Sequence, residues 1–360
     1  MSTSTDMAAT VDSKSRLKHL LISSGGSRAI LAGAGVILVT SHAGITKFKS
    51  IGGISGGSLP TAFVSSGMDA RTSVATALDV DFASLLTRRG SLLKILFASM
   101  MQRYYESSRP RFGVLSSEKL GVYIEEKAKW NELYWTQSCE GETQIICTST
   151  GVHLRKADGS YELLASEPMP LGAAIRGSCA VPGIIDAVPV DIAGKRYWLH
   201  DGVLGPEGRT PVSVPEKFFG AKPEDIIVCD VGDVEETSRR SRIVRSWWQR
   251  LCGKTCLPQH DPEPLSSKDG YIVIFPTVDQ FGSLKFTLTR DEKWQGIMSG
   301  FVGGIEPLEK AGLLVGDKLV AARKIAEDFD KLVADCKKSK AKTGELSRLT
   351  EALLASHGLW

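Results

Sequence analysis

The first part of the chain alternates apolar runs with glycine-rich turns. Residues 17–23 read as a buried strand and residues 47–52 as a second strand, and each ends at a glycine turn. Each turn opens a segment of helical character, at about 29–41 and 56–66. Strand, turn and helix in this order predict a parallel sheet with crossover helices, and ligands bind such sheets at the carboxyl ends of the strands. Both glycine turns are therefore expected at the functional edge.

Further apolar patterns follow. Residues 144–150 and 225–230 read as buried strands, and residues 152–164 and 188–199 alternate about turn residues as hairpins do. Residues 232–270 form a polar, loop-rich insertion, after which we expect strands near 271–276 and 283–289 and helices near 293–310 and 316–333. We predict one domain over 15–335, after a disordered leader at 1–14 and before a basic, amphipathic tail at 336–360.

Composition narrows the classes of protein. The chain has 360 residues, with 44 Lys and Arg against 41 Asp and Glu, so its net charge of +3 gives no indication of a nucleic-acid partner. Its seven cysteines are scattered, and its first residues lack a signal-peptide pattern, which favours a reducing, cytoplasmic compartment. No apolar run is long enough to span a bilayer, so any membrane contact is expected to be peripheral.

The second glycine turn carries a candidate nucleophile. Ser55 is the central residue of a G-x-S-x-G pattern, and a serine on a sharp turn from strand to helix is exposed for attack on a carbonyl. Gly53, Gly56 and Gly57 are the small neighbours that make such an elbow sterically allowed. A glycine-rich turn capped by a serine is the alternative.

Four motifs in order bear on this choice. They are Ser24-Gly25-Gly26-Ser27-Arg28, Gly53-Ile54-Ser55-Gly56-Gly57, Ser178-Cys179-Ala180-Val181-Pro182-Gly183 and His200-Asp201-Gly202. In content and order they resemble the patatin-like phospholipase family, over about residues 17–231. The resemblance implies a three-layer α/β/α fold with a mostly parallel central sheet, and an acyl hydrolase that needs no metal or cofactor.

The same resemblance implies roles for residues. Ser55 would be the nucleophile and Asp201 the general base, with backbone N–H groups of Gly25, Gly26 and Ser27 as the oxyanion hole. Arg28 would position that loop or contact phosphate. The chain departs from the family pattern at Ser27, where a third glycine is common, and at Val203, which follows Asp201-Gly202 in place of Gly or Ala. The asparagine often found after that motif is also not evident.

Three other chemistries stay open. A Ser55, Asp201 and His260 triad is allowed by the order of the residues. The Gly25-Gly26 turn could bind a phosphate at a helix start, although it lacks the spacing of nucleotide-binding loops. Cys252, Cys256 and His260 could ligate zinc but have no fourth ligand at a familiar spacing.

Two segments bear on lipid contact. In the insertion, five arginines flank two adjacent tryptophans, and Arg242, Arg245, Trp247 and Trp248 are candidates for contact with a membrane surface. Tryptophans packed into the protein are the alternative. Apolar residues recur at three- to four-residue steps over 81–105, which predicts an amphipathic helical region. It would serve either as a core-facing helix pair or as a lid or acyl-chain channel.

The predicted function is hydrolysis of a phospholipid or another acyl lipid, of phospholipase A or lysophospholipase type. The second hypothesis is a weakly active or activator-dependent lipid-binding protein that keeps the fold and docks on a membrane or a protein partner through the insertion.

Overall fold

The computed structural model describes residues 18–89, 113–128, 169–181, 184–232 and 269–360, with Leu265 and short stretches between 132 and 165. The expected leader, residues 90–105 of the amphipathic region, and Arg242, Arg245, Trp247, Trp248, Cys252, Cys256 and His260 lie outside the described residues.

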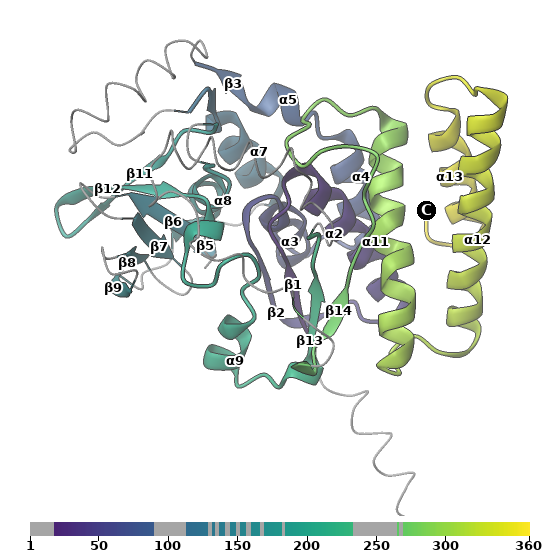
Figure 1. Ribbon diagram of the computed structural model, residues 1–360, viewed down its shortest axis with the longest axis horizontal. Coiled ribbons are helices and arrows are strands. Elements are labelled where there is room, and N and C mark those ends of the chain that lie inside the picture. The colour runs from purple at the N-terminus through teal and green to yellow at the C-terminus, as the bar shows by residue number, and fades with distance from the viewer. Residues whose placement is uncertain are drawn as a thin grey trace, which may run out of the picture.

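A parallel four-stranded sheet forms the centre of the molecule (Figure 1). Its order is β14 (Ile272–Ile274), β13 (Ile226–Cys229), β1 (Lys18–Ile22) and β2 (Phe48–Gly53). β1 is buried along its whole length, including Lys18 and His19, as expected for an inner strand with a neighbour on each side. The expected crossover is present, since α2 (Gly26–Ala43) connects β1 to the parallel β2.

Helices cover one face of this sheet in two layers. α2, α4 (Ala70–Asp79) and α11 (Arg290–Lys310) pack with the sheet in the largest hydrophobic core, and α12 (Gly316–Ser339) and α13 (Glu345–Ser356) lie outside them. α2 and α11 approach each other so closely that a Cβ added at Gly300 of α11 would overlap the Ala32 carbonyl of α2. None of the helices in the described part of the chain is both long and apolar enough to cross a bilayer.

The opposite face of the sheet is covered by the segment that contains α9 (Ser213–Phe219) and η3 (Pro223–Asp225). Leu21 and Val228 on this face pack against Val212 and Ala221. The chain therefore has a mixed α/β architecture in which helices flank a central parallel sheet.

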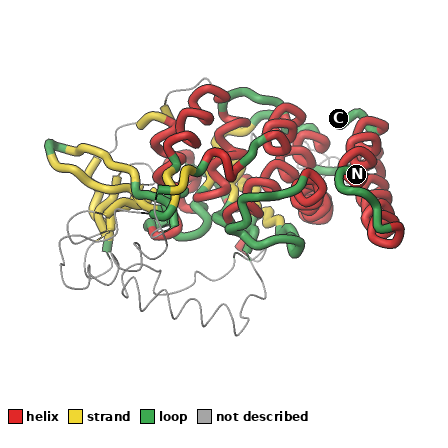
Figure 2. Tube along the Cα trace, turned by 90° about the horizontal axis from the view of Figure 1, so that it is seen from above, coloured by secondary structure: helices red, strands yellow, loops and turns green. Residues whose placement is uncertain are grey.

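A second, antiparallel sheet lies at one end of the molecule, and the C-terminal helices lie at the other (Figure 2). Its order is β11 (Val188–Ile192), β12 (Lys195–His200), β6 (Gln137–Glu140), β7 (Ile145–Thr148), β8 (Val152–Arg155) and β9 (Tyr161–Ala165). β8–β9 and β11–β12 are the two expected hairpins. Ala193 and Gly194 both have positive φ at the second turn, as a tight hairpin requires.

Short elements join the two sheets around a second core. α3 (Ser58–Ser65), α7 (Glu118–Ala128) and α8 (Leu171–Ser178) contribute most of this core. The remaining elements are η1 (Ser55–Gly57), α5 (Phe82–Leu85), β3 (Thr87–Arg88), β4 (Leu115–Ser116), β5 (Glu132–Leu133), β10 (Met169–Pro170) and η2 (Gly202–Leu204).

Two expectations change in the C-terminal part. Residues 283–289 form no strand and instead run as a loop from the sheet to α11. The expected boundary at 335/336 falls inside α12, and α13 packs on α11 and α12 through buried Leu346 and Leu354. The last residues therefore belong to the helical layers, because their apolar face is needed to cover α11.

Candidate active site

Ser55 stands at a sterically restricted elbow directly after β2. Its φ of 53° lies in the left-handed region, which few non-glycine residues adopt, and such strain gathers at functional sites. A Cβ at Gly53 would overlap the Gly57 carbonyl, and one at Gly56 would overlap the Gly26 carbonyl. A Cβ at Gly57 would lie 2.5 Å from two carbonyl oxygens of the β1 end. The glycines are therefore required by the close packing of the elbow.

Two serines hold the elbow in this conformation. The Ser55 N–H donates to Ser178 Oγ at 2.9 Å, and the Ser58 hydroxyl donates to the Ser55 carbonyl at 2.6 Å. Ser178 is the last residue of α8 and is fully buried. The sequence motif included Ser178 without a role, and only the fold reveals that it accepts from the backbone of the elbow.

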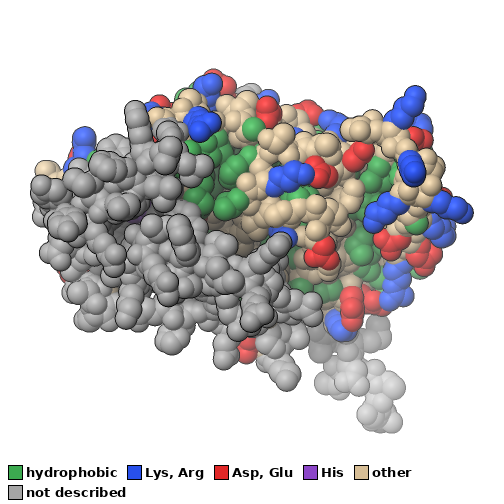
Figure 3. Space-filling view, turned by 45° about the horizontal axis from the view of Figure 1, so that its top comes forward, with side chains coloured by type: hydrophobic (Ala, Val, Ile, Leu, Met, Phe, Trp, Pro, Cys, Tyr) green, Lys and Arg blue, Asp and Glu red, His purple; other side chains and the backbone are tan. Residues whose placement is uncertain are grey.

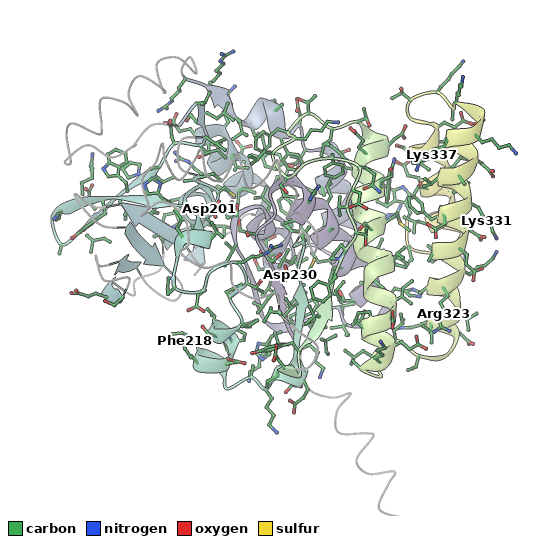
Figure 4. All side chains as sticks on the ribbon, in the orientation of Figure 1. Asp201, Phe218, Asp230, Arg323, Lys331 and Lys337 are labelled. Carbon is green, nitrogen blue, oxygen red and sulfur yellow. The ribbon has the colours of Figure 1, made fainter. Side chains whose placement is uncertain are left out.

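Asp201 comes from the other sheet and meets Ser55 directly. It follows β12, and its Oδ2 accepts a hydrogen bond from the Ser55 hydroxyl at 2.7 Å. Its Oδ1 accepts from the Val203 N–H at 3.0 Å, and its own N–H donates to the Ala180 carbonyl at 3.0 Å. Val203 contributes its backbone, so the departure from the family pattern at this position removes no contact. Figure 4 labels Asp201 between the two sheets.

Burial changes the acidity of this carboxyl group. Asp201 is only 2% exposed, and desolvation raises its pKa to about 6. The hydrogen bonds from Val203 and Ser55 and the charge of His200 act in the opposite direction. The group is therefore ionised at neutral pH and is a stronger base than an exposed aspartate.

The expected donor loop lies beside the elbow. Gly26 begins α2 with a φ of 56°, and Gly26 and Gly56 both line the pocket that contains Ser55. Ser27 differs from the expectation, because its N–H donates to the Ser283 carbonyl at 2.8 Å. That N–H is already bonded to the Ser283 carbonyl, which leaves Gly25 and Gly26 as the candidate donors of this loop. Arg28 Nε donates to the Phe281 carbonyl at 2.7 Å, which is a loop-positioning contact.

An apolar pocket opens at Ser55. It has about 510 Å³ of empty space, part of which is open solvent. Its walls come from α2, α3, α5, α7, the segment after α8 and the loop before α11, through residues that include Ile30, Leu59, Phe82, Leu120, Ile185 and Phe286. Phe82, Leu85 and Leu86 belong to the amphipathic region, and this part of it lines the pocket.

Arg209 ties the base loop to the donor loop. Its carbonyl accepts from the Ser24 N–H at 3.0 Å, and its guanidinium lies 3.2 Å from the buried Asp230 carboxylate at the end of β13. Asp230 is labelled near the centre of Figure 4. Arg209 occupies the stretch in which the sequence lacks an asparagine, and its pairing could not be read from the loop itself.

The zinc and triad alternatives depend on residues outside the described part of the chain. Within the described residues, no group of three or more His, Cys, Asp or Glu could hold a metal ion. The proposed zinc ligands and His260 are not among these residues. Ser55 donates to Asp201 without an intervening imidazole.

Fold and site together define an α/β protein with a serine and aspartate pair in an apolar pocket. No protein-family model matches the chain. The uncharacterized protein YqhO of Bacillus subtilis (strain 168) is 23% identical over 278 residues, which cover 75% of this chain and 91% of that protein.

The solved structures to which the chain is similar include two at 12% identity. VipD from Legionella pneumophila has a TM-score of 0.45, covering 94% of this chain and 80% of that chain. Human GIVD cytosolic phospholipase A2 has a TM-score of 0.41, covering 87% and 61%. At this sequence identity and these TM-scores, neither structure assigns a role to a residue of this chain. The chemistry of this chain is inferred from its own geometry.

Proposed function

We propose that this chain is a patatin-like lipid acyl hydrolase, a carboxylic ester hydrolase of phospholipase A or lysophospholipase type. The observation that carries the proposal is the 2.7 Å hydrogen bond from Ser55 Oγ to Asp201 Oδ2 at a strained elbow inside an apolar pocket. A glycine turn with a capping serine would need neither the buried carboxylate nor the positive φ.

In the acylation step, Ser55 Oγ attacks the ester carbonyl while its proton moves to Asp201 Oδ2. Negative charge develops on the carbonyl oxygen, and backbone N–H groups of Gly25, Gly26 and Gly56 are the proposed donors to it. When the tetrahedral intermediate collapses, the bond to the alcohol breaks, and the alcohol leaves with the proton that Asp201 holds. An acyl group remains on Ser55.

Deacylation reverses the roles. Asp201 takes a proton from a water molecule, whose oxygen attacks the acyl carbonyl, and the proton then returns to Ser55 as the fatty acid leaves. Asp201 needs both ionisation and basicity for this step, and a pKa of about 6 provides both at neutral pH. The proposed acyl-chain site is the apolar pocket, because none of its lining residues in the described part of the chain carries a charge that would bind a head group.

The test is hydrolysis of p-nitrophenyl esters and mixed phospholipids, together with labelling of Ser55 by a fluorophosphonate. We expect turnover and labelling in the wild type, and loss of both in Ser55→Ala. Asp201→Asn should lose about 10²–10⁴-fold in kcat/KM, because general base catalysis is removed.

Matched controls use similar side chains away from the pocket. Ser65→Ala removes a hydroxyl that bonds the Ala62 carbonyl, and Asp191→Asn removes an exposed carboxylate of β11. Both should behave as wild type. Absence of turnover and labelling in the wild type would overturn the proposal that the chain is a hydrolase. It would favour the alternative of a lipid-binding protein that needs an activator or a partner.

We also propose peripheral contact with anionic lipid through Arg242, Arg245, Trp247 and Trp248. The support is their composition, since arginines match lipid phosphates and tryptophans favour the interface. The expected result is flotation of the wild type with anionic liposomes and reduced flotation of a Trp247→Ala/Trp248→Ala variant. Equal flotation of both proteins would exclude this contact.

A further inference from the structure

Residues 281–286, which we call the strap, cross from the parallel sheet toward α11 and pass the start of α2. The sequence pattern predicts a strand here, but the strap forms none. Two residues that the sequence assigned to the donor loop, Ser27 and Arg28, bind the strap backbone instead.

Ser27 is the centre of this attachment. It is fully buried, and its N–H donates to the Ser283 carbonyl at 2.8 Å. Its hydroxyl lies 3.1 Å from the same carbonyl and 3.3 Å from the Gly282 carbonyl. Arg28 Nε adds a bond to the Phe281 carbonyl at 2.7 Å. Three successive strap carbonyls are thus bound by two adjacent residues of α2.

The backbone of Gly26 makes the close approach sterically allowed. A Cβ at Gly26 would overlap the Ser283 carbonyl, so a larger residue would push the strap away. Phe281 is buried in the main core and anchors the start of the strap. The position of the strap is therefore fixed from both sides.

The strap brings two apolar side chains to the pocket. Leu284 and Phe286 both line it, together with Ser55. Leu284 is 52% exposed, whereas Leu59 on the α3 wall is 2% exposed, so Leu284 belongs to the mouth. Because the strap contacts Gly26, and Gly26 packs against Gly56, this wall adjoins the nucleophile elbow.

We propose that Ser27 and Arg28 are positioning residues that hold the strap as one wall of the acyl pocket, and that this wall makes the site selective for acyl chains long enough to touch Leu284 and Phe286. The inference rests on the proposed function and names a determinant of its acyl specificity. An acetyl group is too small to gain from the wall, whereas an octanoyl group gains apolar contact with it.

The experiment compares kcat/KM for octanoyl and acetyl p-nitrophenyl esters, with active sites titrated by fluorophosphonate so that unfolded protein is not counted. Leu284→Ala trims the wall, and we expect the octanoyl to acetyl ratio to fall about tenfold, mainly through KM for the octanoyl ester. Ser27→Ala removes only the hydroxyl contacts and should lower the ratio in the same direction. Arg28→Met, which keeps an apolar stem, should do so as well.

A double variant separates positioning from a general effect. If Ser27 acts through the strap, Leu284→Ala should lower the ratio less in the Ser27→Ala background than in the wild type. Ser65→Ala is the matched control and should leave the ratio unchanged. Additive effects would overturn the inference, as would a wild-type ratio in either Ser27→Ala or Leu284→Ala.

Binding gives a readout that does not need turnover. In a Ser55→Ala background, affinity for a fluorescent long-chain fatty acid should fall when Leu284→Ala or Ser27→Ala is added. If the wild type fails to hydrolyse esters but the variants still lose affinity, the proposed function is refuted, and the strap remains a wall of a fatty-acid binding site. Unchanged affinity in these variants would refute the proposal that the strap forms a wall of the acyl pocket.

Discussion

Asp201 is the residue at which burial and chemistry are most closely linked. A carboxylate that is 2% exposed and accepts two hydrogen bonds is held ionised at neutral pH at a cost in folding free energy. The same desolvation makes it a better base for Ser55. Function and stability therefore depend on one group in opposite directions.

The first prediction concerns the pH dependence of catalysis. Only ionised Asp201 can accept the Ser55 proton, and its pKa is raised to about 6 by desolvation. We expect kcat/KM for a short ester to be nearly constant above pH 7, to be halved near pH 6, and to fall about tenfold per pH unit below about pH 5. A rate profile from pH 4.5 to 8.5 measures this. An apparent pKa near 4, the ordinary value for aspartate, would contradict it.

The second prediction concerns stability at the same residue. Because the folded pKa of Asp201 is above its ordinary value, the wild type loses stability as pH rises from about 4 through 6. Asp201→Asn removes the buried charge, and we expect it to raise the free energy of unfolding by about 2–3 kcal/mol at pH 7.5. Urea unfolding of both proteins at pH 7.5 and 4.5 is the measurement. The gain should shrink at the lower pH, and a gain that is equal at both values would refute this account.

At the scale of elements, the contact between α2 and α11 decides how the main core packs. Gly35 and Gly300 stand at this contact, since a Cβ at either would overlap a carbonyl of the facing helix. Two helices can approach this closely only where small residues meet. α2 begins at the donor loop, so the depth of this packing also fixes the position of the active site.

The third prediction tests this contact. Gly300→Ala forces a Cβ against the Ala32 carbonyl, and we expect a loss of about 2–3 kcal/mol in the free energy of unfolding. Gly303→Ala, one turn further along α11, brings its Cβ no closer than 3.3 Å to Phe275 and should change stability by less than about 1 kcal/mol. Urea unfolding compares the two variants, and equal losses would show that the close approach is not the cause.

The elements around the nucleophile could be predicted because their signals are local. The segments that become β1 and β2, and the glycines around Ser55, encode a strand, a sharp turn and a helix within a few residues each. The Ala193-Gly194 hairpin is equally local. Patterns of this kind depend only on neighbouring residues, so they can be recognised in the sequence without knowledge of the fold.

The remaining features depend on contacts between distant parts of the chain. Ser27 was expected to donate to an oxyanion, but the Ser283 carbonyl, 256 positions later, takes its N–H. Ser178 accepts from Ser55 across 123 positions. The strand predicted at 283–289 does not form, and the Ser283 carbonyl at its start binds Ser27 of α2 rather than a neighbouring strand.

On the scale of the whole molecule, the C-terminal helices complete the fold. Trp294 of α11 is fully buried, and Trp360 packs against it edge to face with ring centroids 5.2 Å apart. The outer surface of α12 and α13 carries interspersed positive and negative side chains (Figure 3). Arg323 and Lys331 of α12, labelled in Figure 4, pair with Glu309 and Asp328, so neighbouring carboxylates balance the positive charge at these two residues.

The fourth prediction concerns this layer. Trp360→Ala removes the ring that covers Trp294, and we expect a loss of about 2–3 kcal/mol in the free energy of unfolding. Phe218→Ala is the aromatic control, because Phe218 is 56% exposed on α9 and should cost less than about 0.5 kcal/mol. Thermal and urea unfolding of both variants and the wild type measure these losses. Equal stability of Trp360→Ala and the wild type would mean that the C-terminal residues are dispensable.

Ser55 follows a strand of the parallel sheet, and Asp201 follows a strand of the antiparallel sheet. Neither sheet alone holds both members of the pair, so under the proposed function Ser55 becomes reactive only after the two sheets have docked. The rate at which fluorophosphonate labelling of Ser55 appears during refolding would therefore measure the rate at which the two sheets dock. An N-terminal fragment that ends before β6 would carry the nucleophile without its base, and labelling would return only when the complementary fragment is added.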